Sequence, residues 1–207
     1  MKGRFISLEG IEGSGKSTQV SFVIDYLQSK NIEVVSTREP GGTLVGERIR
    51  DVLLDNQLPS MHMDTELMLM FAARVEHVKR VILPALESGQ WVVCDRFYDA
   101  TYAYQGYGRQ IDLKRIDALK EFSVGDLAPD LTLLLDVTLD VSMERVTKRG
   151  NKDRFENEKI EFYKKVREGY LTIAKSDPDR VVIVDATGMI DEVQAEIQIK
   201  LDELLNE

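Results

Sequence analysis

Five short apolar runs, separated by stretches with helical periodicity, limit the folds open to this chain. Four runs are strong and one, at 33–36, is weaker; the strong runs lie at 5–8, 91–94, 131–135 and 181–184. None alternates apolar and polar residues, which is typical of parallel strands covered on both faces. Strand and helix alternating five times over predict a doubly wound α/β fold, in which a five-stranded parallel sheet carries helices on both faces.

Three helical stretches support this reading. The first, at 17–29, is amphipathic, and the second, from 65 to about 86, is long and apolar. Pro84 should bend or end the second, because proline removes a helical hydrogen bond. The C-terminal helix carries a clean apolar stripe, made of Ile190, Val193, Ile197, Leu201 and Leu204.

The length and composition narrow the class of protein. A chain of 207 residues predicts a single domain over 1–207, with room for a small mobile insert. Hydrophobic residues at 43% and charged residues at 30% exclude a disordered chain and a membrane protein. No stretch approaches the ~18 apolar residues of a membrane span. The apolar run before Glu9 is too short for a signal peptide, so we expect a cytoplasmic enzyme.

The net charge of −9 argues against nucleic acid or an anionic membrane as a partner, because such a chain repels phosphate on average. Any phosphate that it binds must meet locally concentrated basic groups. Cys94 is the single cysteine and cannot form an internal disulfide. One cysteine and two histidines also argue against a zinc site.

The segment between the first predicted strand and the first predicted helix matches the phosphate-loop pattern G-x-x-x-x-G-K-[ST]. In such a loop successive backbone N–H groups point at a phosphate, Lys16 adds charge for the β- and γ-phosphates, and the Ser17 hydroxyl can hold Mg²⁺. The helix that follows directs its N-terminal dipole at the anion. The predicted nucleotide site comprises Gly10, Ile11, Glu12, Gly13, Ser14, Gly15, Lys16, Ser17 and Thr18.

Most classes of phosphate-loop protein fit poorly. A regulatory GTPase needs N-K-x-D after a strand, and the Asn-Lys-Asp at 151–153 lacks that spacing. The D-x-x-G at 185–188 follows the last strand, where a switch would be misplaced. A motor needs more chain and usually a basic track. A small kinase for a small phosphorylated acceptor remains.

Two arginines and an aspartate support a kinase. Arg38 and Arg96 each follow a predicted strand, at the sheet edge where open parallel sheets bind ligands. Their planar guanidinium groups suit phosphate oxygens, which suggests a clamp for a monophosphate, with a surface ion pair as the alternative for either one. Asp95 ends a strand at the position of a Mg²⁺-linked carboxylate, with direct and water-mediated contact both open.

Three further segments make the chain resemble the thymidylate kinases along essentially its whole length. They read TREPGGT at 37–43, FAAR at 71–74, and DRF at 95–97 leading to AYQG at 103–106. The resemblance implies Mg²⁺-dependent transfer of the ATP γ-phosphoryl group to dTMP, giving dTDP and ADP, by a homodimer. It assigns Arg38 and Arg96 to the acceptor phosphate, with Arg96 also near the transferred group.

The resemblance also implies which residues read the acceptor. Arg74, Thr101 and Gln105 would read the thymine edge, and Tyr104 would lie against the deoxyribose C2′. Phe71 would stack on the base, although many members place the aromatic one residue earlier, where this chain has Met70. A core role is the alternative for both. Glu12 would reach the sugar 3′-hydroxyl, and Ala100 replaces a serine that relatives often have.

The charged segment around Asp153-Arg154-Phe155-Glu156 resembles the family's lid, placed at about 144–157. Some members carry a catalytic arginine in the phosphate loop where this chain has Gly13, and others supply it from the lid. Gly13 together with the basic lid fits the second arrangement, with Arg149 as the catalytic arginine beside Lys16, Asp95 and Arg96; the other lid cations are Arg145, Lys148 and Arg154. A solvated helix is the alternative for this segment.

Two other functions are weighed against this one. A deoxynucleoside kinase shares the phosphate loop, an Asp-Arg pair and a basic lid, but its uncharged acceptor has less use for Arg38 as a clamp. An ATP-sensing regulator without transfer activity should have lost the lid or the acceptor residues, and the sequence retains them.

Overall fold

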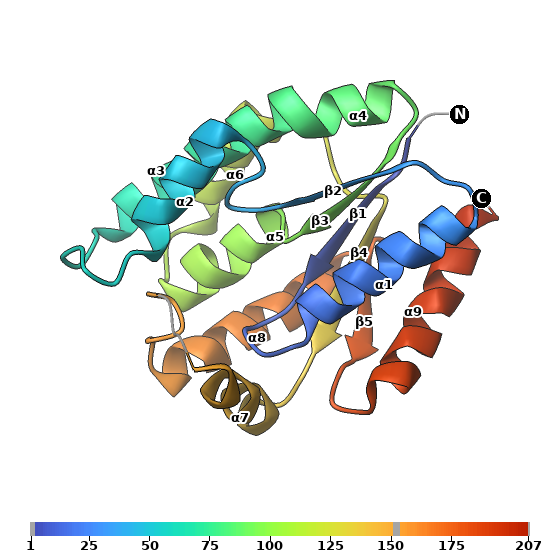
Figure 1. Cartoon of the computed structure of the whole chain (residues 1–207). Helices are drawn as coiled ribbons and strands as arrows, with labels where there is room; N and C mark the ends of the chain where they lie inside the picture. Colours follow the sequence, from blue (N-terminus) through green and yellow to red (C-terminus); the bar gives the residue numbers. More distant parts are fainter. Residues whose placement is uncertain (1–2, 151–153, 207) are drawn as a thin grey trace.

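The computed structural model describes residues 3–150 and 154–206, except the side chain of Arg149. In this part of the chain five strands form one sheet in the order β2-β3-β1-β4-β5, and every neighbouring pair is parallel (Figure 1). The strands are β1 (Phe5–Glu9), β2 (Val34–Arg38), β3 (Trp91–Asp95), β4 (Leu131–Asp136) and β5 (Val181–Asp185). The predicted five-stranded parallel α/β sheet is confirmed.

Helices cover both faces of the sheet. On one face α1 packs against β1, β2 and β3 and against α9, and on the other α8 packs against β4 and β5 (Figure 1). The described helices are α1 (Lys16–Ser29), α2 (Leu44–Leu54), α3 (Met63–His77), α4 (Leu83–Glu87), α5 (Tyr98–Thr101), α6 (Leu113–Val124), α7 (Leu139–Arg149), α8 (Ile160–Ser176) and α9 (Ile190–Leu205), with π-helical segments η1 (Val78–Ile82) and η2 (Tyr102–Gly108). None in the described residues is long and apolar enough to cross a membrane.

The long apolar stretch predicted as one helix from 65 to about 86 is divided. Its α-helical geometry changes at Val78, where the π-helical η1 begins, and α4 follows with Pro84 in its first turn. Proline is tolerated in the first turn of a helix, because the N–H groups there make no hydrogen bond within the helix. The departure from the α-helix therefore precedes Pro84 by six residues, and the proline begins a helix where the sequence suggested a bend or an end.

All five strands extend past the predicted apolar runs into polar residues, with Asp136 ending β4 and Asp185 ending β5. Glu9 ends β1, Arg38 ends β2 and Asp95 ends β3, and Asp95 is aligned with both Leu8 and Arg38. Backbone pairing does not require an apolar side chain, so the ladder continues beyond the core. The sheet thereby brings three ionisable side chains to the carboxyl edge of three neighbouring strands, beside the loop that leaves β1.

Candidate active site

A cavity of about 390 Å³ opens at this carboxyl edge. It combines the phosphate loop, the ends of β2 and β3, α3, the α5–η2 region and the segment around Phe155. The predicted site residues that line it are Glu12, Gly13, Gly15, Lys16, Ser17, Thr18, Arg38, Arg74, Asp95, Arg96, Thr101, Tyr104 and Gln105. Segments far apart in the sequence therefore meet at one place.

Lys16 lies over the phosphate loop. Its Nζ donates to the carbonyl oxygens of Gly10 (3.1 Å) and Ile11 (3.0 Å), and the side chain is almost fully buried. Burial lowers the pKa of Lys16, and nearby Arg96 lowers it further. Gly10, Ile11 and Ser14 are not among the described lining residues, but the two carbonyl contacts show how this part of the loop holds the lysine.

The other side of the loop rests on α7. The Oγ of Ser142 donates to the carbonyl oxygen of Glu12 at 2.7 Å. Gly13 has a φ of +72°, and a Cβ there would stand 2.6 Å from the carbonyl oxygen of Ser142. The Nη1 of Arg145 donates to the carbonyl oxygens of Gly13 (3.3 Å) and Ala186 (3.0 Å). The space that a side chain at position 13 would need is thus occupied by the backbone of α7.

Arg96 is fixed by several hydrogen bonds. Its Nη2 donates to Glu12 Oε1 (2.6 Å) and the Tyr104 hydroxyl (3.0 Å), and its Nη1 to the Gly10 carbonyl (2.9 Å) and the Tyr170 hydroxyl (3.0 Å). Burial alone would lower the pKa of Arg96, but Tyr104 and Glu12 outweigh it and raise the pKa well above its usual value. The backbone φ of Arg96 is +70°, a strained conformation that is typical of functional sites.

Glu9 is a functional candidate that sequence reasoning missed. It is fully buried, and its carboxyl group accepts hydrogen bonds from the Phe97 N–H (2.6 Å) and the Tyr170 hydroxyl (2.7 Å). Burial, followed by the charge of Asp99, raises its pKa from 4.5 to about 7. The sequence signal was a carboxylate directly before a phosphate loop, which a reading of apolar runs treats only as the end of a strand.

Asp95 and Ser17 line the cavity beside the phosphate loop. The Oδ1 of Asp95 is buried and has no hydrogen-bond partner among the described residues. Those residues also contain no cluster of three or more His, Cys, Asp or Glu side chains that could hold a metal alone. Mg²⁺ usually takes one or two protein ligands and completes its shell with water and substrate phosphates. This pair therefore fits a Mg²⁺ shared with phosphates.

Arg38 both lines the cavity and forms an ion pair. Its Nη2 donates to Glu47 Oε2 at 2.8 Å, with the Arg38 side chain 53% exposed. Arg50, one turn beyond Glu47 on α2, also lines the cavity, and its Nη1 donates to the Pro40 carbonyl at 2.9 Å. Sequence reasoning missed Arg50, although its spacing from Glu47 puts both on one face of α2.

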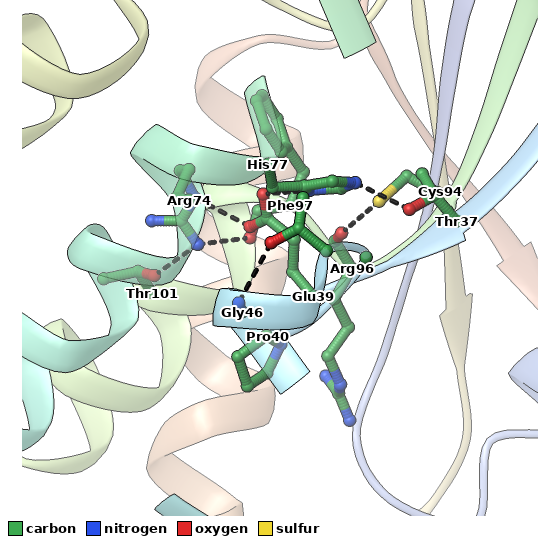
Figure 2. Close-up of polar contacts among 12 residues, drawn as sticks. Thr37, Glu39, Pro40, Gly46, Arg74, His77, Cys94, Arg96, Phe97 and Thr101 are labelled. Carbon is green, nitrogen blue, oxygen red and sulfur yellow. Dashed lines mark hydrogen bonds and ion pairs between the residues drawn. The ribbon is translucent and has the colours of Figure 1, made fainter. Parts of the chain in front are cut away.

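Arg74 is buried and lines the cavity. Its Nε donates to Glu39 Oε2 at 2.7 Å, and its Nη2 donates to Thr101 Oγ1 (2.9 Å) and the Phe97 carbonyl (3.3 Å) (Figure 2). Its Nη1 is buried without a hydrogen-bond partner in the described part of the chain. A buried donor left unpaired costs roughly 1–3 kcal/mol, so Nη1 is suited to a ligand carbonyl.

Phe71 does not occupy the position predicted for it. It is 3% exposed, packs in a core cluster with Leu67, Ile111 and Ile116, and is not among the described residues that line the cavity. Met70 lines the cavity instead. The two residues are about 100° apart on α3, so one faces the cavity and the other faces α6. The expectation that Phe71 stacks on a base is corrected accordingly, and Phe71 packs against the Arg74 guanidinium at 4.8 Å.

Glu66 connects Gln105 of the cavity wall to the segment after α7. Its carboxylate accepts from Gln105 Nε2 (2.8 Å) and Arg109 Nε (3.2 Å), and pairs with Arg154 Nη1 at 2.8 Å. Arg154 Nε also donates to the Leu53 carbonyl at 2.7 Å. We call Glu66, Gln105, Arg109 and Arg154 the Glu66 cluster. Sequence reasoning missed Glu66, because one charge in an apolar helix has no distinctive pattern.

The predicted catalytic arginine, Arg149, has a side chain that lies outside the described part of the structure. The other lid cations have separate contacts. Lys148 pairs with Glu144 at 2.6 Å on the surface, Arg154 belongs to the Glu66 cluster, and Arg145 contacts the phosphate loop. Arg145 is therefore the described lid cation that reaches this loop and lines the cavity.

A phosphate loop opening into an arginine-lined cavity can bring two phosphorylated molecules together and keep water away from them. Together with the sheet order, this places the chain in the class of P-loop kinases. A profile of the thymidylate kinase family matches residues 8–197. The chain therefore belongs to the thymidylate kinase family.

Individual relatives agree with the family match. A thymidylate kinase from Ruthia magnifica is 49% identical over 203 residues, covering 98% of this chain and 99% of the relative. One from Pseudomonas fluorescens is 52% identical over 205 residues, with 99% and 98% covered. The crystal structure of thymidylate kinase from Ehrlichia chaffeensis is 37% identical, with a TM-score of 0.78 over 97% of this chain and 99% of that one.

Proposed function

We propose a division of roles among these residues for the reaction of the family, in which the γ-phosphoryl group of ATP passes to dTMP and gives dTDP and ADP. This chain's place among the phosphotransferases acting on dTMP follows from its family membership. An oxygen of the acceptor phosphate attacks the γ-phosphorus, and the bond to the β–γ bridging oxygen breaks. The attacking oxygen of the acceptor phosphate is already nucleophilic, so no general base is needed. Catalysis is therefore mainly positioning and charge stabilisation.

The phosphate loop binds the donor. Its backbone from Gly10 to Thr18 surrounds the ATP phosphates, and Lys16 stabilises the charge on the transferred group. Ser17 and Asp95 hold Mg²⁺, which when bound neutralises phosphate charge and orients the phosphates. The buried, unpartnered Oδ1 of Asp95 supports this assignment.

The opposite wall binds dTMP. Arg38 and Arg96 hold its phosphate, while Glu12, 2.6 Å from Arg96, faces the sugar 3′-hydroxyl. Arg74, Thr101 and Gln105 read the base, Tyr104 lies against the sugar, and Met70 replaces Phe71 as the residue of α3 that faces the base. The single observation that carries this assignment is the buried, unpaired Nη1 of Arg74 at the cavity wall.

The lid, at about 144–157, supplies a cation as it closes. Arg149 is the catalytic arginine of this proposal and stabilises the transferred phosphoryl group. Arg145 holds the phosphate loop through its hydrogen bond to the Gly13 carbonyl. The lack of space for a side chain at Gly13 supports an arginine that comes from the lid. Arg149→Ala should reduce kcat steeply and leave the affinity for dTMP nearly normal, and an unchanged kcat contradicts the role.

We further propose a single domain over 1–207 that acts as a homodimer in the cytoplasm. Exposed apolar side chains on α2 and α3 support an interface there, and include Leu44, Val45, Val52, Met63 and Met68. A monomer in sedimentation experiments at micromolar concentration contradicts this part of the proposal.

The function is tested by ADP release from Mg-ATP with dTMP, dUMP, AMP, CMP or thymidine as the acceptor. Turnover should be highest with dTMP and negligible with thymidine, because thymidine carries no phosphate for Arg38 and Arg96. A preference for thymidine contradicts the phosphate clamp and indicates a nucleoside kinase. Slow release that is indifferent to the acceptor leaves only nucleotide binding.

A further inference from the structure

His77 contacts two residues of the TREPGGT segment, next to Arg74 (Figure 2). Its Nε2 is 2.6 Å from Thr37 Oγ1, and its Nδ1 is 3.0 Å from Glu39 Oε1. The other oxygen of Glu39 accepts from Arg74 Nε at 2.7 Å. The contacts thus run without a break from Thr37 through His77 and Glu39 to Arg74, and all but the threonine are buried.

The chemistry of the groups fixes the direction of the hydrogen bond between His77 and Glu39. A carboxylate accepts only, and one oxygen of Glu39 already accepts from the guanidinium of Arg74. The Nδ1 of His77 must therefore carry a proton and donate to the second oxygen. The Thr37 hydroxyl can both donate and accept, so it satisfies Nε2 in either role. The two donors that contact Glu39, His77 Nδ1 and Arg74 Nε, both point toward its carboxylate.

The loop that carries Glu39 also encloses the imidazole ring. Gly42 has a φ of +78°, and a Cβ there would stand 2.5 Å from Cδ2 and 2.6 Å from Nε2 of His77. Even an alanine would displace the ring. Thr37, Glu39 and Gly42 therefore together fix the position of His77, in addition to the role of Arg38 in the same segment.

Arg74 is constrained on every side but one. Its Nε and Nη2 are hydrogen-bonded, and the rings of Phe71 and Phe97 lie 4.8 and 5.7 Å from the guanidinium carbon. Only Nη1 lacks a partner in the described part of the chain. A planar guanidinium has no freedom to move one nitrogen by itself, so the Nε contact with Glu39 sets where Nη1 points.

We propose that His77 is a positioning residue for acceptor selection: it holds the Glu39 carboxylate, which orients Arg74 so that Nη1 donates to a pyrimidine 4-carbonyl oxygen. The proposal rests on the proposed function of the cavity. It adds that the TREPGGT segment acts in base selection through a histidine on α3, in addition to binding phosphate. A ligand with an amino group at this position meets a second donor and is rejected.

A matched pair of variants tests the proposal. In His77→Asn the amide nitrogen takes the place of Nδ1 and keeps the hydrogen bond to Glu39. In His77→Gln the amide group reaches only the place of Nε2, which retains a contact for Thr37 and loses Glu39. Glutamine is closer to histidine in volume, so a packing role predicts that His77→Asn is the more severe change. The positioning role predicts that His77→Gln is the more severe change.

The expected result is a separation of KM from kcat. His77→Gln should raise the KM for dTMP about tenfold, as expected for the loss of one buried hydrogen bond, with kcat and the KM for ATP nearly unchanged. The preference for dTMP over dCMP should fall by a similar factor. His77→Asn should stay close to the wild type in both measurements.

A milder effect for His77→Gln than for His77→Asn, or equal effects, overturns the proposal and indicates a packing role. If neither variant folds, Thr37→Val decides: a raised KM for dTMP with an unchanged KM for ATP supports the proposal, and an unchanged KM for dTMP overturns it. Wild-type turnover with dTMP is measured first. Its absence contradicts the proposed function, whereas a reversed order of the variants contradicts only the role of His77.

Discussion

Two buried carboxylates near the cavity differ sharply in their electrostatics. Glu66 is 1% exposed and Glu9 is 0% exposed, so burial penalises the ionised form of each. Burial would raise the pKa of Glu66, but Arg109 and hydrogen bonds from Gln105, Arg109 and Arg154 hold it below its usual value. The pKa of Glu9 rises to about 7.

The difference lies in the partners. Glu66 has direct contact with two guanidinium groups, whereas Glu9 accepts from neutral donors, the Phe97 N–H and the Tyr170 hydroxyl. Arg96 acts on Glu9 from beyond Tyr170, and Asp99 opposes it. The hydrogen bonds from these neutral groups lower the pKa of Glu9, but burial and the charge of Asp99 outweigh them. Ion pairs hold the Glu66 cluster together, whereas hydrogen bonds from neutral groups hold Glu9 beneath the phosphate loop.

The largest expected effect follows from removing the charge of Glu66. Glu66→Leu leaves Arg109 and Arg154 near one another in a buried place without their shared carboxylate, which should lower the free energy of unfolding by about 3–5 kcal/mol. Urea unfolding at pH 7 measures the change. Glu66→Gln keeps the shape and should lose less. A loss below about 1 kcal/mol for the leucine variant shows that the cluster is not held by charge.

A second prediction concerns the pH dependence of Glu9. Between its unfolded pKa of 4.5 and its folded value of about 7, the unfolded chain releases the proton while the folded chain keeps it. Stability from this group is complete below pH 4.5 and is lost as the pH rises, by about 3 kcal/mol at pH 8. Glu9→Gln carries no proton to lose, so its stability relative to the wild type should rise over this range.

The contribution of Glu66 to stability should depend on pH in the opposite direction, which makes it the comparison for Glu9. Its folded pKa is depressed, so its contribution is present above pH 4.5 and is lost on further acidification. The difference in stability between Glu66→Gln and the wild type should shrink below pH 4.5, whereas that of Glu9→Gln changes between 4.5 and 7. Parallel curves for the two variants contradict the distinction between the sites.

A third prediction concerns Tyr170→Phe, which removes one of the two neutral donors to Glu9. The hydroxyl donates to Glu9 and accepts from Arg96, so its loss should cost about 1–2 kcal/mol. The same hydrogen bond lowers the pKa of Glu9, so its removal should move the pH-dependent loss of stability to higher pH. The measurement is urea unfolding between pH 4.5 and 9, and an unshifted transition argues against contact between these two side chains.

The smallest effect is expected at an exposed pair in the same region. Arg115 and Asp64 are 2.8 Å apart, with side chains 54% and 43% exposed. Arg115→Ala should change the free energy of unfolding by less than about 1 kcal/mol, because solvent screens exposed charges. A loss comparable to that of Glu66→Leu shows that burial does not decide the energy of these arginine pairs.

The strands and the phosphate loop depend on local patterns, which explains why the sequence predicted the parallel sheet, whereas the strand order depends on pairing between distant segments and came from the structure. Apolar runs marked all five strands, and the motif from Gly10 to Ser17 marked the loop. The strand ends were predicted short because Glu9, Arg38 and Asp95 are polar, while the ladder continues through their backbone. The π-helical turn at Val78–Ile82 had no signal in the pattern of side chains.

The site was predictable only where a motif named its residues. Arg74, Thr101 and Gln105 line the cavity as expected, whereas Phe71 faces the core and Met70 faces the cavity. The sequence does not indicate which of the two neighbouring residues faces the cavity, because this helix is apolar on both faces. Glu39, Glu66 and His77 were missed because each acts through partners 35 or more residues away.

The close contact between Gly13 and the backbone of Ser142 has an evolutionary consequence. In this chain a side chain at position 13 would meet the Ser142 carbonyl oxygen, so an arginine there requires α7 to move. Starting from this chain, a transfer of the arginine from the lid to the phosphate loop therefore involves α7 as well as the loop. The contact is with backbone, so a smaller side chain at position 142 should not relieve it, and Gly13→Arg alone should lose activity.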